Sequence, residues 1–249
     1  MLNSKPLHCS QTESSQGEAF SSPLFPVTIL ANTPQANGYV LLCLAIPPEI
    51  PLLENNYLLF IKLDNILPVM RVNPAQQTLD VLCSANAALY QIGTQYVATL
   101  LHKPFIVFQS PITLLIAENN YIASLVFLVN RLRVQQQAQT MVCFLTAEAA
   151  FPFKPRPSQI FLPAMPDGVI AAMPLLDDWG VVSRLAHEDD LVGCYAGHIV
   201  ALIRHYLTTQ APENISIQAI VSPTRARAIH ALIDEYPIQA IHTTVIDSV

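Results

Sequence analysis

The spacing of apolar runs along the chain restricts the fold more than any other feature. Between residue 25 and about residue 104, short runs are separated by Pro, Asn and Gly. These runs are "FPVTILANT", "GYVLLCLAI", "NYLLFIKL", "PVMRV", "TLDVLCSA" and "QYVATLL". Short runs rich in β-branched and aromatic residues, set close together, are typical of antiparallel strands. This part of the chain is therefore predicted to form an antiparallel β-barrel or sandwich.

The pattern changes after residue 106. Strand-like runs ("ITLLIA", "TMVCFLTA", "ISIQAIVS" and "IQAIHTTVI") alternate with segments of helical length ("YIASLVFLVNRLRVQQQ", "AGHIVALIRHYL" and "PTRARAIHALIDEY"). Strands that alternate with helices predict a parallel sheet covered on both faces. Residues 151–190 are rich in proline and predict a long irregular connection, with room for one short edge strand near residues 159–162.

The fold class that follows is β plus α/β: an N-terminal antiparallel barrel and then a parallel-sheet domain. We expect a flexible tail at residues 1–24, whose Ser- and Gln-rich sequence lacks hydrophobic periodicity. The barrel is expected over residues 25–106 and the α/β domain over residues 107–249. A chain of 249 residues with 52% hydrophobic residues can fill two such cores.

Composition excludes several classes of partner. The net charge is −6 and no Lys or Arg cluster occurs, which argues against a nucleic-acid partner. The mean hydropathy is +0.39, yet Pro47 and Pro48 end one apolar stretch and Glu118 interrupts another, so no membrane span is expected. The apolar excess instead predicts a protein partner or a homo-oligomer. Five scattered cysteines predict reduced thiols, a cytoplasmic location and no metal site.

One segment has the order strand, turn and helix that usually surrounds a nucleotide phosphate. It is "LLIAENNYIASLV", and its turn holds Glu118, Asn119 and Asn120 where a phosphate loop would carry glycine. Asparagine tolerates the left-handed conformations of such a turn, so the backbone shape can persist. A carboxylate about 5 Å from a diphosphate charge costs roughly 3 kcal/mol at an effective dielectric near 20. We therefore expect Glu118 to repel a phosphate ligand.

A second candidate site begins at Ser222. The sequence "SPTRAR" predicts a helix with Ser222 as its N-cap, then Pro223 in the first position and Thr224, with Arg225 and Arg227 in the first turn. A cation there opposes the helix dipole unless an anion lies nearby. The pattern is compatible with a phosphate or carboxylate site, and equally with arginine side chains that are simply solvated.

The order of these parts resembles the ferredoxin-reductase-like flavoproteins, and most specifically the electron-transfer subunit of dihydroorotate dehydrogenase. The segments that carry the resemblance are "LPVMRV" in the barrel, then "LLIAENNYIASLV", "GCYAGHIVALIRHYL" and "AIVSPTRARAIHAL". The resemblance implies an FAD-binding-like barrel and an NAD(P)-binding-like α/β domain. The cofactor-binding candidates that it implies are Arg71, Asn119, Asn120, Ser222, Thr224 and Arg225.

The chain departs from the family's motifs at the positions that contact cofactors. The family's glycine-rich turn, G-G-x-G-I-A-P, has lost its glycines, and its R-R-P-x-S clamp aligns with Asp64, Asn65, Ile66 and Pro68. The family's cysteine cluster has no counterpart, so no iron–sulfur centre is expected. We expect no catalytic residue, and the favoured hypothesis is a non-catalytic binding or assembly module. The alternative is an active FAD-dependent oxidoreductase that passes electrons from NAD(P)H to a partner protein.

Overall fold

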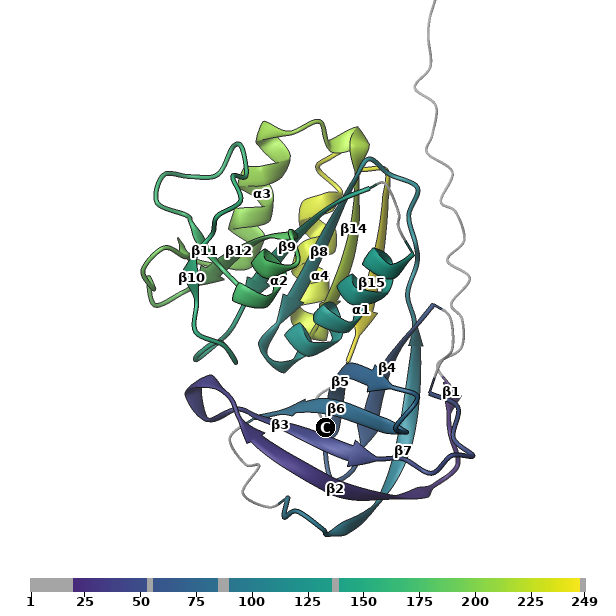
Figure 1. Cartoon of the computed structure of the whole chain (residues 1–249). Coiled ribbons are helices and arrows are strands. Elements are labelled where there is room, and N and C mark those ends of the chain that lie inside the picture. Colours follow the sequence, from purple (N-terminus) through teal and green to yellow (C-terminus); the bar gives the residue numbers. More distant parts are fainter. Residues whose placement is uncertain (1–19, 53–55, 85–89, 136–138, 247–249) are drawn as a thin grey trace, which may run out of the picture.

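The computed structural model describes residues 20–52, 56–84, 90–135 and 139–246. These residues form a seven-stranded antiparallel sheet, a six-stranded parallel sheet and a small two-stranded ribbon. The antiparallel sheet curls into a barrel at one end of the molecule, and the parallel sheet with its helices stands above it (Figure 1). The predicted fold class, a barrel followed by an α/β unit, is confirmed.

Six strands close the barrel. They are β2 (Phe25–Pro34), β3 (Val40–Ala45), β4 (Tyr57–Lys62), β5 (Ile66–Asn73), β6 (Thr78–Cys83) and β7 (Gln95–Pro104). The order is β7-β2-β3-β6-β5-β4, and pairing between β4 and β7 closes the ring. The 3-10 turn η1 (Ala36–Gly38) links β2 to β3 through Asn37, which has a φ of 56°. Asparagine adopts this left-handed conformation at low cost, as its place between two predicted strands suggests.

A short strand, β1 (Phe20–Ser21), extends the barrel wall and lies within the segment for which the sequence predicts no regular structure. It pairs with Leu101 and His102 of β7. Strand β2 pairs only with residues 95–98 of β7, so the rest of that long strand has backbone groups free on this side. Two residues of the N-terminal segment cover them, and the remainder of the expected tail, residues 1–19, lies outside the described residues.

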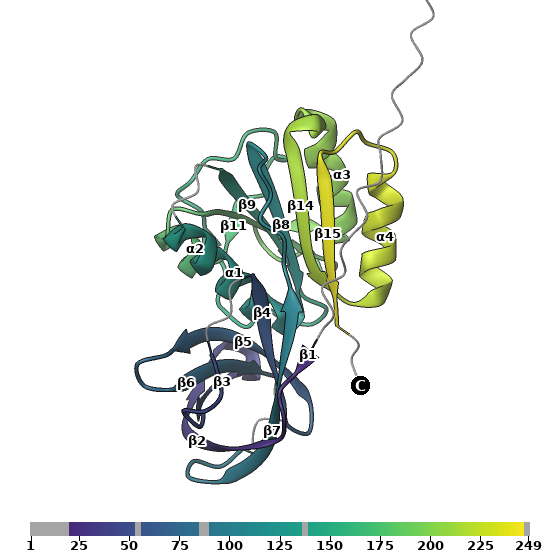
Figure 2. The same cartoon turned by 90° about the vertical axis from the view of Figure 1, so that its right-hand side faces the viewer.

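The second sheet is entirely parallel. Its strands are β8 (Ile112–Glu118), β9 (Thr140–Thr146), β12 (Val182–His187), β13 (Tyr195–Ala196), β14 (Ile215–Val221) and β15 (Ala240–Val245), in the order β13-β12-β9-β8-β14-β15. Helix α1 (Ile122–Val134) covers one face; α3 (Ile199–Thr209) and α4 (Pro223–Ile233) cover the other (Figure 2). The 3-10 turn η4 (Pro212–Asn214) precedes β14. The predicted two-sided cover is confirmed.

The proline-rich connection contains more regular structure than its sequence suggests. It forms the ribbon of β10 (Arg156–Pro157) and β11 (Ala171–Ala172), then the short helix α2 (Pro174–Asp178) and strand β12. No strand forms at residues 159–162, so that expectation is wrong. The sequence does not predict strand β12, because Ser183, Arg184 and His187 interrupt its apolar pattern. All three residues are nevertheless buried. Each of the three side chains forms a hydrogen bond with a main-chain atom, which offsets part of the cost of burying it.

Helix α1 joins the two units because it packs against the parallel sheet on one side and against β4 and β5 of the barrel on the other. Nine of its 13 residues are buried, including Leu125 and Val129 at 0% exposure. The linker after β7 is fixed as well, since His242 Nε2 donates to the carbonyl of Pro104 at 3.1 Å. Burial lowers the pKa of His242, and this hydrogen bond opposes the shift. Among the described residues, no helix is both long and apolar enough to cross a membrane.

Candidate functional site

The candidate site lies at the carboxyl end of the parallel sheet, which faces the barrel (Figure 1). Strand β8 comes first in the sequence; β9 and β12 follow on one side of it, whereas β14 and β15 lie on the other. The strand order therefore reverses between β8 and β14. In open α/β sheets, ligands bind at the carboxyl ends of the strands at such a reversal. This geometry brings the end of β8 and the start of α4 together.

The carboxylate of Glu118, the last residue of β8, occupies this position. Glu118 is 1% exposed. One of its oxygens accepts the backbone N–H of Ser222, and the other accepts Nε–H of Arg225 at 3.2 Å. The Arg225 side chain is itself only 17% exposed. The sequence predicts that Glu118 repels an external anion; in the structure its carboxylate is bonded to the chain's own donors on Ser222 and Arg225.

The start of helix α4 explains why a carboxylate is stable there. Ser222 is the N-cap and Pro223 is the first helical residue, as predicted, but the Ser222 hydroxyl forms no capping hydrogen bond. Its backbone N–H is instead satisfied by Glu118. The positive end of the helix dipole and the guanidinium of Arg225 both favour a negative charge at this point. The anion expected near Arg225 is therefore a carboxylate of the chain itself. Thr224, which precedes Arg225 in the sequence, is exposed.

The turn after β8 keeps its shape without glycine. It forms the 3-10 turn η3 (Asn119–Tyr121), in which Asn119 has a φ of 52°. The left-handed conformation predicted for an asparagine here is confirmed for Asn119. Its side-chain oxygen accepts the backbone N–H of Glu148 at 2.9 Å, which ties the turn to the segment after β9. Asn120 is half-buried in the same turn, and the N–H of Ile122 bonds back to the carbonyls of both asparagines.

Arg71 is not part of this cluster. It lies in β5 with a side chain that is 63% exposed, and its guanidinium is 3.9 Å from Asp80 on the neighbouring strand β6. An exposed pair at this separation contributes less than about 1 kcal/mol. Two of the six residues that the sequence nominates, Ser222 and Arg225, bond to Glu118. Asn119 and Asn120 follow Glu118 in its turn. Thr224 is exposed next to Arg225 in the sequence, and Arg71 lies on the barrel surface.

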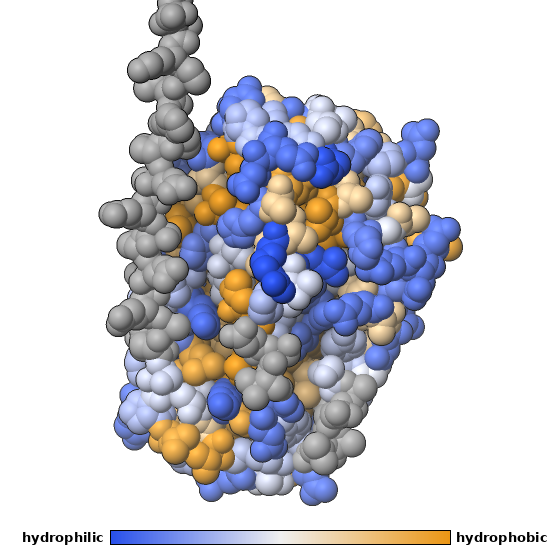
Figure 3. Space-filling model, turned by 180° about the vertical axis from the view of Figure 1, so that it is seen from behind, coloured by the Kyte–Doolittle hydropathy of each residue, from blue (hydrophilic) through white to orange (hydrophobic). Residues whose placement is uncertain are grey.

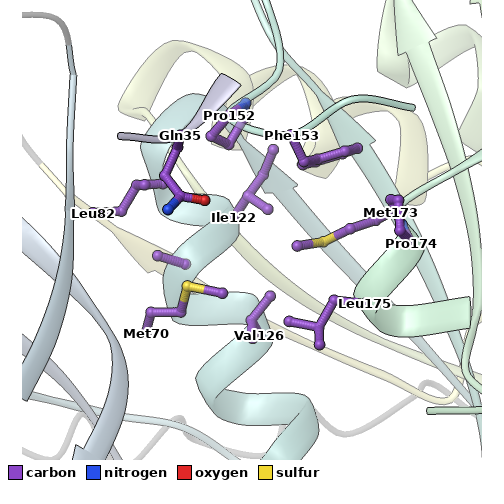
Figure 4. Close-up of a pocket in the computed structure, with 11 residues that line it drawn as sticks. Gln35, Met70, Leu82, Ile122, Val126, Pro152, Phe153, Met173, Pro174 and Leu175 are labelled. Carbon is purple, nitrogen blue, oxygen red and sulfur yellow. The ribbon is translucent and has the colours of Figure 1, made fainter. Parts of the chain in front are cut away.

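A cavity of about 180 Å³ opens beside the first turns of α1 (Figure 4). Its walls come from the barrel (Gln35, Met70 and Leu82), from α1 (Ile122, Ala123 and Val126) and from the connection (Pro152, Phe153, Met173, Pro174 and Leu175). The lining is almost wholly apolar. Ligand sites for drug-sized molecules usually measure roughly 300–1,000 Å³. This cavity is smaller than that range, so it accommodates a compact apolar group and not a dinucleotide.

Thiol and metal chemistry find little support in the described part of the chain. Burial raises the pKa of Cys194 to about 11 and raises the pKa of Cys143 as well. Both thiols are therefore protonated at neutral pH, whereas nucleophilic cysteines act as thiolates. Within the described residues, no group of three or more His, Cys, Asp or Glu side chains is placed to hold a metal ion.

The pairing of Glu118 with Arg225 is the feature that the separate motifs do not reveal. Each residue draws attention alone: a carboxylate at the end of a strand, and a cation in the first turn of a helix. The signal that joins them is topological, because β8 and β14 are adjacent and parallel, and Glu118 ends one strand while Ser222 follows the other. A sequence pattern fixes the strands but not which of them are neighbours.

Comparisons with known proteins find a similar fold only among solved structures. No protein-family model matches the sequence, and no curated protein matches it either. Solved structures do match. The siderophore-interacting protein from Acinetobacter baumannii has a TM-score of 0.61 and 13% identity, over 92% of this chain and 93% of that one. Phthalate dioxygenase reductase has a TM-score of 0.62 and 10% identity, over 89% and 68%.

A ferredoxin NADP⁺ reductase from Neisseria gonorrhoeae, solved with bound FAD and NADP, has a TM-score of 0.57 and 11% identity, over 89% of this chain and 99% of that one. Identities this low establish similarity of fold alone. The chain therefore has the fold of the ferredoxin-reductase-like flavoproteins.

Proposed function

We propose that the protein is a non-catalytic binding or assembly module that retains the ferredoxin-reductase-like fold. The observation that carries the proposal is the Glu118 carboxylate at the strand reversal, bonded to the N–H of Ser222 and to Arg225. A nucleotide diphosphate would need those same donors. These donors are already bonded to the Glu118 carboxylate, which carries the same sign of charge as the diphosphate.

The energetic argument has two parts. A diphosphate placed beside Glu118 meets a repulsion of roughly 3 kcal/mol at about 5 Å. Displacing Glu118 instead strands a carboxylate that is 1% exposed, together with the guanidinium that it neutralises. Removing one partner of a buried ion pair costs about 3–5 kcal/mol. Either route weakens binding by two or more orders of magnitude, since about 1.4 kcal/mol is a factor of ten.

The barrel supports the same proposal. Where the family resemblance implies a cationic flavin clamp, the chain has Asp64 and Asn65, and both are exposed. Arg71, the barrel cation that the sequence nominates, lies beside Asp80. The proposal keeps the two units at residues 25–106 and 107–249, and it keeps the particular likeness to the dihydroorotate dehydrogenase electron-transfer subunit as an inference from the order of sequence parts.

Exposed apolar side chains provide a surface for contact with a protein partner. Val192 is 98% exposed and Phe161 is 83% exposed, each in a loop of the α/β unit. Large apolar side chains at such exposure are typical of surfaces that contact other proteins. The proposed partner is another protein or a second copy of this chain. The proposed location is the cytoplasm, where the thiols stay reduced.

The alternative is an active FAD-dependent oxidoreductase that takes electrons from NAD(P)H. The observation in its favour is that the fold similarity extends over 89% of this chain to a reductase solved with both FAD and NADP. Such an enzyme would have to bind both dinucleotides away from Glu118, using backbone groups and stacking.

The absorption spectrum of the freshly purified protein separates the two functions. We expect a colourless protein, no FAD released on denaturation, and no rise in melting temperature when FAD or NADPH is added. A ligand that binds the folded state raises its stability in proportion to RT ln(1 + [L]/Kd), so the absence of a shift at high ligand concentration is informative. Stoichiometric flavin, or reduction of added flavin by NADPH, would establish the oxidoreductase instead.

A further inference from the structure

The outer edge of strand β15 (Ala240–Val245) is an open sheet edge. β15 ends the parallel sheet, and in the described part of the chain no strand pairs with its outer side (Figure 2). Its sequence, AIHTTV, contains no Lys, Pro, Asp or Glu, and its pairing with β14 has no bulge. Proteins usually protect an exposed edge with such features or by shortening the strand. The opposite edge follows that rule, because β13 has only two residues.

A groove runs beside this edge, between β15 and helix α4. It is open to solvent and measures about 600 Å³. It is lined by Arg227 and His230 from α4, by Asp234 at the C-cap of α4, and by Thr243 and Val245 from β15. Figure 3 views the molecule from behind, the side of α3 and α4, and shows apolar groups scattered among hydrophilic ones over this face. Arg227 and Asp234 are exposed, and within the described residues neither forms an ion pair.

The groove carries one cationic and one anionic side chain, so the grooves of two copies can be electrostatically complementary to each other. Arg227 and Asp234 are seven residues apart on α4, so they lie on the same side of the helix, about two turns from each other. His230 lies midway between them and is hydrogen-bonded through Nε2 to Thr243, near the middle of β15, at 3.1 Å. The centre of the charged pair on the helix and the centre of the open strand are therefore at the same level.

These positions fit a simple two-fold arrangement of two copies. A two-fold axis perpendicular to the sheet, at the level of Thr243, would set two β15 strands antiparallel and edge to edge. The same operation would lay α4 of each copy beside α4 of the other, on one face of the joined sheet, and in opposite directions. Arg227 of each copy then faces Asp234 of its partner, so that one surface patch satisfies itself twice.

We infer that a second copy of this chain docks on the β15 edge and the α4 groove, forming a symmetric dimer with a continuous twelve-stranded sheet, six strands from each copy. The inference rests on the proposed assembly function for its choice of partner. Edge pairing satisfies the backbone groups that alternate residues of each β15 strand direct away from β14. The two Arg227–Asp234 contacts offset locally the repulsion between two chains that each carry a net charge of −6.

The test is the molar mass of the full chain in solution, measured by sedimentation velocity over a range of concentrations. We expect a dimer for the wild type. Arg227→Glu and Asp234→Arg each place like charges opposite one another at two symmetry-related points, and each should weaken the dimer by at least about tenfold. The combined variant, Arg227→Glu with Asp234→Arg, restores opposite charges across the axis and should restore the dimer.

Lys62→Glu is the matched control for Arg227→Glu, because it makes the same change in net charge at an exposed residue of the barrel. It should leave the dimer intact. A wild type that is monomeric at every concentration would overturn the inference, and so would single reversals that act no more strongly than Lys62→Glu or a combined variant that fails to recover. A monomer without flavin would remove the dimer alone, whereas a flavin-loaded dimer would remove only the non-catalytic function.

Discussion

Replacement of Glu118 by alanine is expected to lower the free energy of unfolding by about 3 kcal/mol. The substitution deletes the acceptor for the Ser222 N–H and the counter-ion of Arg225, whose side chain is only 17% exposed. The guanidinium then remains at the positive end of helix α4 without an anion. Urea denaturation of the wild type and the variant measures the difference directly.

A double-mutant cycle with Arg225→Met isolates the ion pair, because the two substitutions together remove both charges. We expect the double variant to be more stable than the sum of the two single effects predicts. Asp80→Ala is the control, since it breaks the exposed Arg71–Asp80 contact and should cost less than about 1 kcal/mol. An effect of Glu118→Ala no larger than that of Asp80→Ala would mean that the carboxylate is not a buried partner.

Replacement of Phe144 by alanine is expected to cost about 4 kcal/mol. Phe144 lies in β9 at the centre of the parallel sheet, with 0% of its surface exposed. Its ring meets Tyr206 of α3 edge to face, with centroids 5.3 Å apart. Truncation removes that contact and leaves a cavity that neighbours on a central strand cannot refill, which for Phe→Ala typically costs about 3–5 kcal/mol.

Phe161→Ala provides the comparison for Phe144, because it is the same substitution at a side chain that is 83% exposed. Its expected effect on the unfolding free energy lies within about 0.5 kcal/mol of zero. Thermal and urea unfolding of both variants should rank them clearly. Equal losses from the two substitutions would contradict the packing described for the sheet and α3.

Most of the fold can be predicted from the sequence because its strands and helices follow simple periodicities. The six barrel strands β2 to β7 correspond to the six apolar runs, and Ser222 and Pro223 mark the start of α4 correctly. Strand β12 could not be found this way, since Arg184 and His187 look like loop residues. Their burial depends on main-chain carbonyls, those of Ile160 and Ala149, which come from distant segments.

The candidate site shows the same division. The turn geometry of Asn119 is predictable because φ preferences are local. The role of Glu118 is not, because it depends on the adjacency of β8 and β14, whose contacting residues are 104 positions apart in the Glu118–Ser222 hydrogen bond. From the sequence alone, the negative charge of Glu118 is expected to face an external anion and to repel it. The structure puts it opposite the chain's own cation and helix end.

We propose that the Glu118 carboxylate holds the anion position at the strand reversal. The decisive experiment is a parallel titration of the wild type and Glu118→Ala with inorganic pyrophosphate, at constant ionic strength and followed by melting temperature. We expect no change for the wild type and a clear rise for the variant, because the emptied position then offers Ser222 N–H and Arg225 to the added anion. Pyrophosphate that stabilises the wild type as much as the variant would contradict it.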